Sequence, residues 1–301
     1  MLFALAPVFA QGDALPMTRI ERDPAAAGMA GASMASTSSS SAAWSAFRNG
    51  ALLPFARMEC FSAGANYQIW SPDLAKTTHI NVGAAYKLSD RFGFSLGFAS
   101  QSGEAYDVFN ADGTPAGCYY PKDMILAFGA GFAVTDQLSV GVNARYARQN
   151  LSDDVSYNGT SGDLYILYRP AEALNLTAGV STLGTKITSA SGNSFSQPAS
   201  VMLAGSYGLD LLDGTFSVEP NLAADYYFSG NWAAAAGAEL GFKNIVFARA
   251  GYRLASKEAV IPSHASVGVG LQLKGVRLDA AWLTASKALG NTLTLSLGYS
   301  F

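Results

Sequence analysis

The sequence has little charge and no long apolar run. Charged residues make up 14% of the chain, although 50% of its residues are hydrophobic. Soluble domains usually carry about 25% charged residues, so this composition is unusual for one. A membrane-spanning helix needs about 18 or more consecutive apolar residues, and the sequence contains no such run. These two absences exclude a helical membrane protein and disfavour an ordinary soluble domain.

Histidine and cysteine are equally scarce, which limits the chemistry available. His79 and His264 are the only histidines, and neither has a carboxylate or cysteine at metal-ligand spacing. We expect both to be solvated residues near the extracellular rim. No Ser/His/Asp set is apparent, so we expect no enzyme, no metal and no cofactor. The net charge of −3 gives no reason to expect nucleic-acid binding. Cys60 and Cys118 are expected at opposite ends of the fold, too far apart for a disulfide.

The main pattern in the sequence is an alternation of large apolar residues with small polar ones. Near the C-terminus Leu293, Leu295 and Leu297 alternate with small polar residues, and the chain ends in Phe301. Successive side chains of a strand point to opposite faces, so one face is apolar and the other small and polar. Because the pattern recurs along most of the chain, it predicts an all-β transmembrane antiparallel barrel. A terminal aromatic such as Phe301 is typical of outer-membrane proteins inserted by the barrel-assembly machinery.

Alternation and turn residues together predict the individual strands. The barrel domain covers 57–301, and an even strand number is expected of bacterial single-chain barrels. We predict fourteen strands, at about 58–70, 76–88, 92–102, 121–134, 138–150, 160–169, 174–184, 198–208, 214–227, 231–242, 245–255, 264–274, 276–286 and 291–301.

The predicted connections divide into short and long ones. If the N-terminus is periplasmic, the turns between even and odd strands are short and periplasmic. The longest connections, at 103–120, 151–159 and 185–197, then fall on the extracellular side. This asymmetry is expected of outer-membrane barrels. We therefore predict a multi-pass barrel in the outer membrane of a Gram-negative bacterium, with outer-membrane lipid around it.

The first 56 residues show no period of two. Residues 1–10 resemble the end of a secretory signal peptide. A short apolar N-terminus without a targeting role would show the same pattern. Residues 11–56 are predicted to form a plug-like segment of short helices and turns, with 23–56 inside the barrel. The alternative is a disordered periplasmic tail, but aromatic residues argue against it. The candidate plug residues are Asp23, Gly28, Gly31, Trp44, Phe47 and Asn49.

Inward-facing charges are predicted mainly on late strands. Ionised groups confined in a lumen need partners, so acids and bases should pair across neighbouring strands. Such a lattice would fill the barrel and hold the plug; the alternative is a conducting or solute-selective constriction. The predicted members are Glu219, Asp225, Glu239, Arg249, Arg253, Arg277 and Asp279.

Loop 103–120 is a candidate partner-binding surface. Exposed aromatic residues beside glycine and proline suit protein binding. They would equally suit a lid over the barrel or part of an aromatic girdle. The residues concerned are Tyr106, Phe109, Tyr119 and Tyr120.

Two segments and the strand count resemble the PorV/PorQ family within the FadL-like barrels. The segments are Arg22 to Ala32 and the aromatic patch Ala43 to Ala51, in which Gly50 stands where the family motif Trp-Asn-Pro-Ala has proline. The resemblance implies an outer-membrane protein of Bacteroidota. It also implies a cargo carrier of type IX secretion, or a paralogue serving another machine such as the barrel-assembly complex.

Two functions therefore compete. The first is a non-enzymatic protein-interaction subunit of a secretion or assembly machine, which the plug, the aromatic loop and the resemblance favour. The alternative is a FadL-like transporter of hydrophobic small molecules. Such a transporter needs an apolar pocket in the lumen and a breach in the wall.

Overall fold

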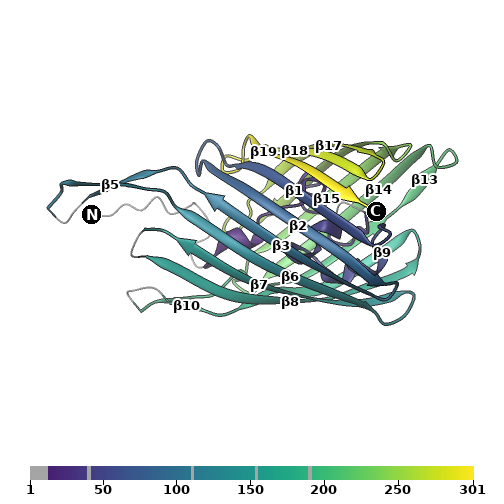
Figure 1. Ribbon diagram of the computed structural model, residues 1–301, viewed down its shortest axis with the longest axis horizontal. Coiled ribbons are helices and arrows are strands. Elements are labelled where there is room, and N and C mark those ends of the chain that lie inside the picture. Colours follow the sequence, from purple (N-terminus) through teal and green to yellow (C-terminus); the bar gives the residue numbers. More distant parts are fainter. Residues whose placement is uncertain (1–12, 39–41, 110–111, 153–154, 189–191) are drawn as a thin grey trace.

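The computed structural model describes residues 13–38, 42–109, 112–152, 155–188 and 192–301. Most of them belong to strands arranged as one barrel (Figure 1). The barrel strands are β1 (Phe61–Trp70), β2 (Thr77–Ser89), β3 (Phe92–Ser102), β6 (Lys122–Ala133), β7 (Leu138–Asn150), β8 (Ser156–Ala171), β9 (Leu174–Gly184), β12 (Ser200–Tyr207), β14 (Phe216–Tyr227), β15 (Trp232–Phe242), β16 (Val246–Ala255), β17 (His264–Leu273), β18 (Val276–Thr284) and β19 (Thr292–Ser300).

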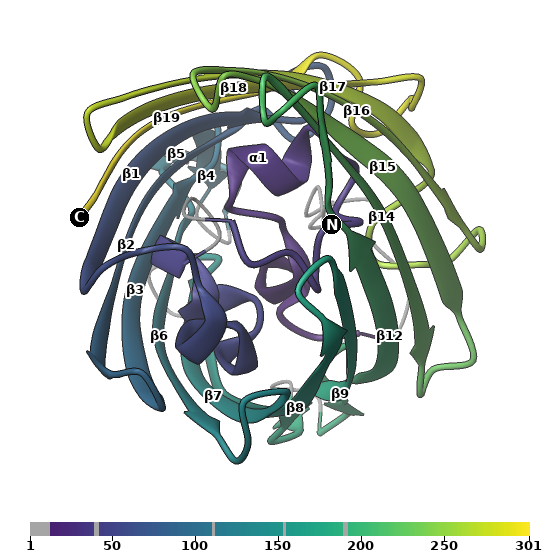
Figure 2. The same ribbon diagram turned by 90° about the vertical axis from the view of Figure 1, so that its right-hand side faces the viewer.

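The strands close into a ring of antiparallel neighbours, seen end-on in Figure 2. β1 pairs with β19, so the last strand closes the barrel against the first. A short strand, β13 (Leu209–Leu211), continues the line of β12 along the edge of β14. Fourteen strands therefore stand side by side, and the predicted fold class is confirmed. Three of them, 92–102, 138–150 and 174–184, have the predicted bounds.

The two faces of the wall separate as the alternation predicts. In β19 the side chains of Thr292 and Thr294 are fully buried, whereas Leu295 and Leu297 are exposed. Large apolar residues are exposed in this way around the barrel. Such an outer belt is the surface that a transmembrane barrel presents to lipid.

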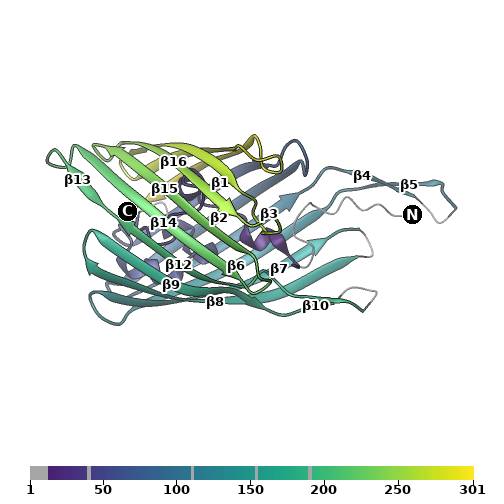
Figure 3. The ribbon, with the colours of Figure 1, turned by 180° about the vertical axis from the view of Figure 1, so that it is seen from behind.

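The two ends of the barrel differ. One end carries short turns, such as 90–91 and 274–275, and we call it the turn end. The other carries the longer connections and is called the loop end. Two hairpins that the alternation missed lie there: β4 (Tyr106–Phe109) with β5 (Pro115–Tyr119), and β10 (Ile187–Thr188) with β11 (Ser194–Phe195). Figure 3 shows β4 and β5 extending beyond the barrel, at the opposite end from β13.

Residues 13–38 and 42–56 lie inside the barrel, where Figure 2 shows their helices surrounded by strands. The short helices are η1 (Pro16–Arg19), α1 (Pro24–Ala27), η2 (Ser45–Phe47) and η3 (Gly50–Phe55). Pro24 occupies the first turn of α1, where its missing N–H costs nothing. Most side chains of this segment, which we call the plug, are buried.

The described start of the chain lies at the loop end, which the sequence analysis places on the extracellular side, and not at the turn end. Asp13 bridges Ser196, and Ala14 N–H donates to the Ser196 carbonyl at 2.8 Å, both at the loop end. The plug then runs through the lumen to the turn end, where β1 begins. The order of the strands and the sides of the turns are unaffected. No helix in the described ranges is long and apolar enough to cross a membrane.

Candidate functional site: a plugged lumen

The turn half of the lumen is filled by η2 and η3, which lie directly on the wall. A Cβ atom at Gly141 would overlap the Ala51 nitrogen, and one at Gly131 would overlap the Gly50 carbonyl oxygen. The lumen glycines of β6 and β7 therefore accommodate the plug backbone instead of leaving open space. The pattern of small inward residues was visible in the sequence, but its counterpart in the plug was not.

Polar side chains of the wall fasten this half of the plug. The Asn143 carboxamide donates to the carbonyls of Ser45 and Ala46, at 2.8 and 3.0 Å, and accepts from Gly50 N–H at 3.0 Å. Ser139 donates to the Ala51 carbonyl at 2.6 Å. Because these groups are all buried, each bond removes a desolvation penalty that an unpaired group would carry.

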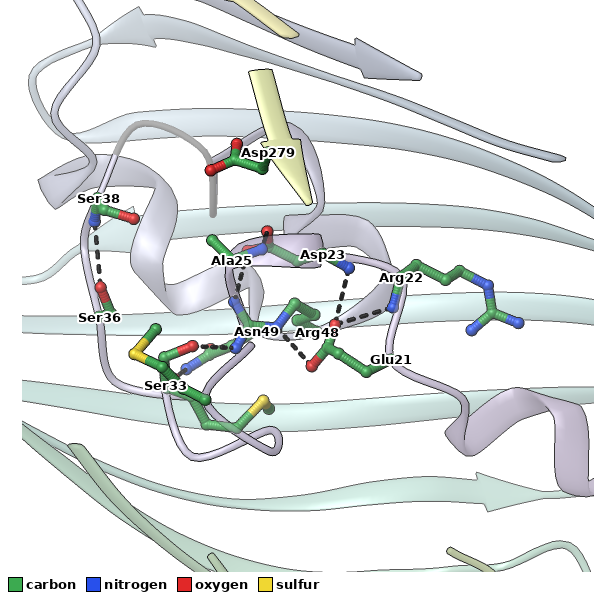
Figure 4. A network of polar contacts seen from close by, with 12 residues as sticks. Glu21, Arg22, Asp23, Ala25, Ser33, Ser36, Ser38, Arg48, Asn49 and Asp279 are labelled. Atoms are coloured by element: carbon green, nitrogen blue, oxygen red, sulfur yellow. Dashed lines mark hydrogen bonds and ion pairs between the residues drawn. The ribbon is translucent and has the colours of Figure 1, made fainter. Parts of the chain in front are cut away.

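Arg48 joins the two halves of the plug (Figure 4). Its guanidinium contacts Glu21 and Asp23, both at 3.2 Å, and donates to Ser33 at 3.0 Å. Asp23 also caps α1 by accepting from Ala25 N–H at 3.0 Å. A buried arginine is stable only with such partners, so Arg48 ties the segment after η1 to η2.

The other predicted plug residues also lie inside the barrel and against the wall. Gly28 contacts the backbone of Gly268, and Gly31 has a positive φ of 80°. The Trp44 ring lies over Gly64 and Gly83, and the Phe47 ring lies over Gly97. Asn49 donates to the Thr177 hydroxyl at 3.1 Å and accepts from Ala51 N–H at 3.0 Å.

Four of the predicted lumen charges form one cluster. Arg249 contacts Glu239 at 2.6 Å and Asp279 at 2.8 Å. Arg277 contacts Asp279 at 3.0 Å and Glu239 at 3.5 Å. The cluster is buried on β15, β16 and β18, so charges from neighbouring strands compensate one another.

A second cluster joins the wall to the start of the plug. Asp225 lies between Arg253, at 3.3 Å, and Arg19 of η1, at 2.8 Å. Glu219 lies opposite Glu239 in the β14–β15 pairing and accepts from the Asn221 amide at 3.3 Å.

Besides Arg48 and Glu21, sequence reasoning missed three charged residues that contact the wall. The buried pair Arg145–Asp163 bridges β7 and β8, and alternation places both residues inward, so this pair could have been found. Arg19 lies in a segment without periodicity, and no signal in the sequence identifies its partner.

Both histidines lie close to the loop end, but the expectation that they are solvated is wrong. His79 is 1% exposed and His264 is 4% exposed, because both side chains point into the lumen. His79 hydrogen-bonds to Thr77 at 3.1 Å, and His264 Nδ1 lies 2.8 Å from the Pro262 carbonyl. Within the described ranges no three His, Cys, Asp or Glu side chains gather as metal ligands would.

The aromatic loop residues lie on and beside the β4–β5 hairpin, which projects past the barrel (Figure 1). The rings of Tyr106 and Tyr119 are 5.7 Å apart, and Phe109 and Tyr120 are 59% and 60% exposed. A projecting hairpin does not cover the mouth as the lid alternative requires. Cys118 lies on it, and both Cys118 and Cys60 are free.

Phe301 lies at the turn end, where the barrel closes. Its ring is 5.6 Å from that of Phe61 and 5.7 Å from that of Tyr299. Its carbonyl accepts from the N–H groups of Cys60 and Phe61, both at 2.9 Å.

The loop half of the lumen holds a cavity of about 100 Å³. Part of its lining is apolar, from Ile20, Phe47 and Leu283, and part is charged, from arginines of plug and wall. The cavity borders a buried apolar cluster that joins the plug to the loops. Leu15 and Met17 of the plug cluster there with Ile187, Val260 and Leu289.

The outer face carries a second, shallow depression of about 1170 Å³. It lies where Ala63, Ala65 and Ala84 replace larger residues on the lipid side of β1 and β2. The wall behind its β19–β3 part is continuously hydrogen-bonded, and Arg145 contributes to the lining of both spaces.

Comparison with known proteins gives structural matches only. No family model matches the chain, and no curated protein does. The Pseudomonas putida toluene transporter TodX superposes with a TM-score of 0.62 at 14% identity, covering 97% of this chain and 98% of TodX. The CymD monoaromatic hydrocarbon channel gives 0.63 at 15% identity, covering 93% and 97%. A Pseudomonas aeruginosa FadL homologue gives 0.57 at 12% identity, covering 97% and 100%.

These likenesses extend over nearly the whole of each chain, and at such low identity they concern the fold. They provide no support for a PorV/PorQ relationship in particular. The lipid-facing belt and the closed ring of fourteen strands agree with them. The chain has the fold of the FadL-like barrels of Gram-negative outer membranes.

Proposed function

We propose that this barrel passes hydrophobic small molecules across the outer membrane. The observation that carries the proposal is the partly apolar cavity in the loop half of the lumen, which the start of the plug helps to line. TodX and CymD, whose fold this chain shares, are described as a toluene transporter and a monoaromatic hydrocarbon channel. The chain spans nearly their full length, which supports the same class of solute here.

Because the wall strands are hydrogen-bonded to one another and the plug fills the lumen, part of the protein must move before a solute can pass. Every barrel strand is paired with both neighbours, and the pairing is interrupted between β8 and β9 at Asp163. The turn half of the plug rests on wall glycines with little room to shift. The start of the plug is instead held to the wall by the Arg19–Asp225 ion pair and by apolar side chains. A solute would therefore have to displace the segment around η1 to reach the cavity.

Uptake by cells tests the proposal. The barrel is produced in a Gram-negative host without related channels, and initial uptake of radiolabelled toluene is measured. We expect faster uptake than in cells without the barrel, and no faster uptake of a sugar of similar size. Met202→Trp should abolish the gain because Met202 lines the cavity, whereas Met124→Trp, outside the cavity, should not. Equal toluene uptake with and without the barrel would refute the proposal.

A secretion or assembly subunit is the second candidate, and one observation favours it. The β4–β5 hairpin projects from the barrel with exposed aromatic side chains, as a protein-binding surface would. Gentle detergent extraction should then recover a large outer-membrane partner. That partner should be lost when a short turn replaces 106–119, but kept when one replaces the smaller β10–β11 hairpin. Recovery of a lone barrel would remove this candidate.

A further inference from the structure

Two charged side chains interrupt the apolar outer face of the wall. On the described barrel strands every charged residue points into the lumen except Lys122 of β6 and Arg148 of β7. Both are exposed, and they alternate with the buried residues Asp123 and Ala147. A cation on the lipid face costs about 2–4 kcal/mol at mid-membrane, falling to about 0–1 kcal/mol at the membrane surface. Both residues lie at the loop end of their strands, where this cost is small.

Asn150 brings the two cations together. Lys122 and Asn150 are paired across β6 and β7, and the Asn150 amide donates to the Lys122 carbonyl at 3.1 Å. The Asn150 amide oxygen accepts from Arg148 Nε at 3.0 Å, which draws the guanidinium toward Lys122. Neither cation forms an ion pair with a carboxylate of the described residues. The Lys122 ammonium and the terminal nitrogens of Arg148 are thus available to an anion.

The shallow depression of the outer face begins directly beside this pair. Tyr146, two residues before Arg148, and Leu126, four residues after Lys122, both line it and are paired across the two strands. Two residues of a strand span about 7 Å, so the cations and the depression are within reach of one ligand. Small residues such as Ala65 make room for apolar groups there. A pair of cations therefore stands at the loop-end rim of an apolar hollow.

We propose that this face binds lipopolysaccharide, the phosphate-bearing lipid of the outer leaflet. The loop end is the extracellular end in the orientation that the short turns indicate, so the pair lies at the level of the head groups of that leaflet. Lys122 and Arg148 bind a phosphate through charge-assisted hydrogen bonds, and acyl chains lie in the depression. Clustered basic residues at a membrane surface recognise lipid phosphates in this way. The site is outside the barrel and does not depend on the proposed passage of solutes.

A second copy of this chain is a less suitable occupant. The outer face of the described barrel strands carries no carboxylate that could pair with the two cations. Two barrels meeting there would leave both cations uncompensated in an apolar contact, which is costly. A phosphate supplies the missing charge, so charge complementarity favours the lipid.

Binding of lipid A, the phosphorylated acyl anchor of lipopolysaccharide, tests the proposal. The full chain is folded in detergent micelles and titrated with bisphosphorylated lipid A, and the bound lipid is counted by native mass spectrometry. We expect one tightly bound lipid for each barrel, and at least tenfold weaker binding by Lys122→Gln/Arg148→Gln. The matched control is Lys76→Gln/Lys257→Gln, which removes two exposed cations from other loops and should stay within twofold. Unchanged binding by the first double variant would overturn the proposal.

The apolar half of the site is tested by filling it. Ala65→Phe places a ring in the depression and should weaken lipid A binding about fivefold. Ala234→Phe, at an exposed position of β15 outside the depression, is the matched control and should leave binding unchanged. A gel run before and after heating shows that each variant is folded. Equal binding by the two variants would contradict a lipid chain in the depression.

The unmodified protein gives an independent test through the lipid. Lipid A without its phosphates should bind at least tenfold more weakly, and equal binding would overturn the proposal. Phosphatidylglycerol that bound as tightly as lipid A would overturn it too, because the site would then accept any anionic lipid. A lipid-free dimer that Lys122→Gln/Arg148→Gln separates would assign the face to a second copy instead.

Asp153 and Asp154, in the loop after β7, lie outside the described residues, and their charges are tested by substitution. Asp153→Asn/Asp154→Asn should change lipid A binding by less than twofold. A tenfold gain in affinity would mean that these carboxylates already neutralise Lys122 and Arg148, and it would contradict the proposal.

Discussion

Asn143 of β7 holds Gly50 of the plug in place, accepting its backbone N–H at 3.0 Å while donating to two other plug carbonyls. One wall side chain therefore satisfies three plug backbone groups. Asn143→Ala would remove all three bonds, although the Ser45 carbonyl still accepts from Arg48 N–H, and each buried group left unpaired costs about 1–3 kcal/mol. We expect a loosened plug in an intact barrel, seen as higher conductance in planar bilayers. Asn158→Ala, at an exposed position, is the control. Unchanged conductance of Asn143→Ala would show that the plug does not depend on this anchor.

The glycines beneath the plug should tolerate no side chain. Gly141→Ala places a methyl group on the Ala51 nitrogen, and overpacking of this kind typically costs about 1–3 kcal/mol. Limited proteolysis should then cut within the plug while the strands stay protected. Gly208→Ala is the matched control, because its nearest neighbour would be the Ala173 carbonyl oxygen at 3.9 Å. Equal protease resistance of the two variants would contradict the close contact.

The buried charge cluster should be less tolerant of substitution than charges in the loops. Arg249→Ala leaves Glu239 and Asp279 without that partner, and breaking a fully buried pair costs about 3–5 kcal/mol. Arg277→Ala should act in the same direction, whereas Lys257→Ala changes an exposed loop residue. The temperature at which the folded barrel converts to the slower-migrating form on a gel reports the difference. Identical temperatures for all three would mean that the lumen is wet and its charges are independent.

The two cysteines should report the two ends of the barrel. A membrane-impermeant maleimide added to intact cells should label Cys118, in the projecting hairpin, and spare Cys60 at the turn end. The Cys118 thiol donates to Asp107 at 3.3 Å, and this bond and the Asp107 charge raise the pKa of the thiol. A raised pKa means less reactive thiolate at neutral pH. Asp107→Asn should therefore speed labelling severalfold. Labelling of Cys60 from outside would show that the barrel has the opposite orientation in the membrane.

The parts of this fold that face lipid were predictable, because lipid imposes a period of two on every strand. The bounds of 138–150 follow directly from that alternation. The β10–β11 hairpin lies outside the membrane belt and has no such constraint, so its strands left no pattern. The path of the plug was equally hidden. Its contacts, such as Arg19 with Asp225, join residues far apart in the sequence.

The lumen charges, too, were predictable only in part. Alternation placed Arg249 and Asp279 on the inner face, and the rule that confined charges pair indicated that they would meet. It could not indicate that the Arg22 guanidinium would donate to the carbonyls of Ile20 and Met17, because the plug sets its environment.

The proposed passage of solutes through the loop end requires movement of the start of the plug, and a reversible crosslink tests this most directly. Asp13 and Ser196 form a β-bridge, so cysteines at both positions lie within disulfide reach. The background carries Cys60→Ser and Cys118→Ser, which prevents other pairings. Toluene uptake should stop when Asp13→Cys/Ser196→Cys is oxidised and return when it is reduced, while either single variant is insensitive to redox state. Undiminished uptake by the fully crosslinked protein would contradict the account.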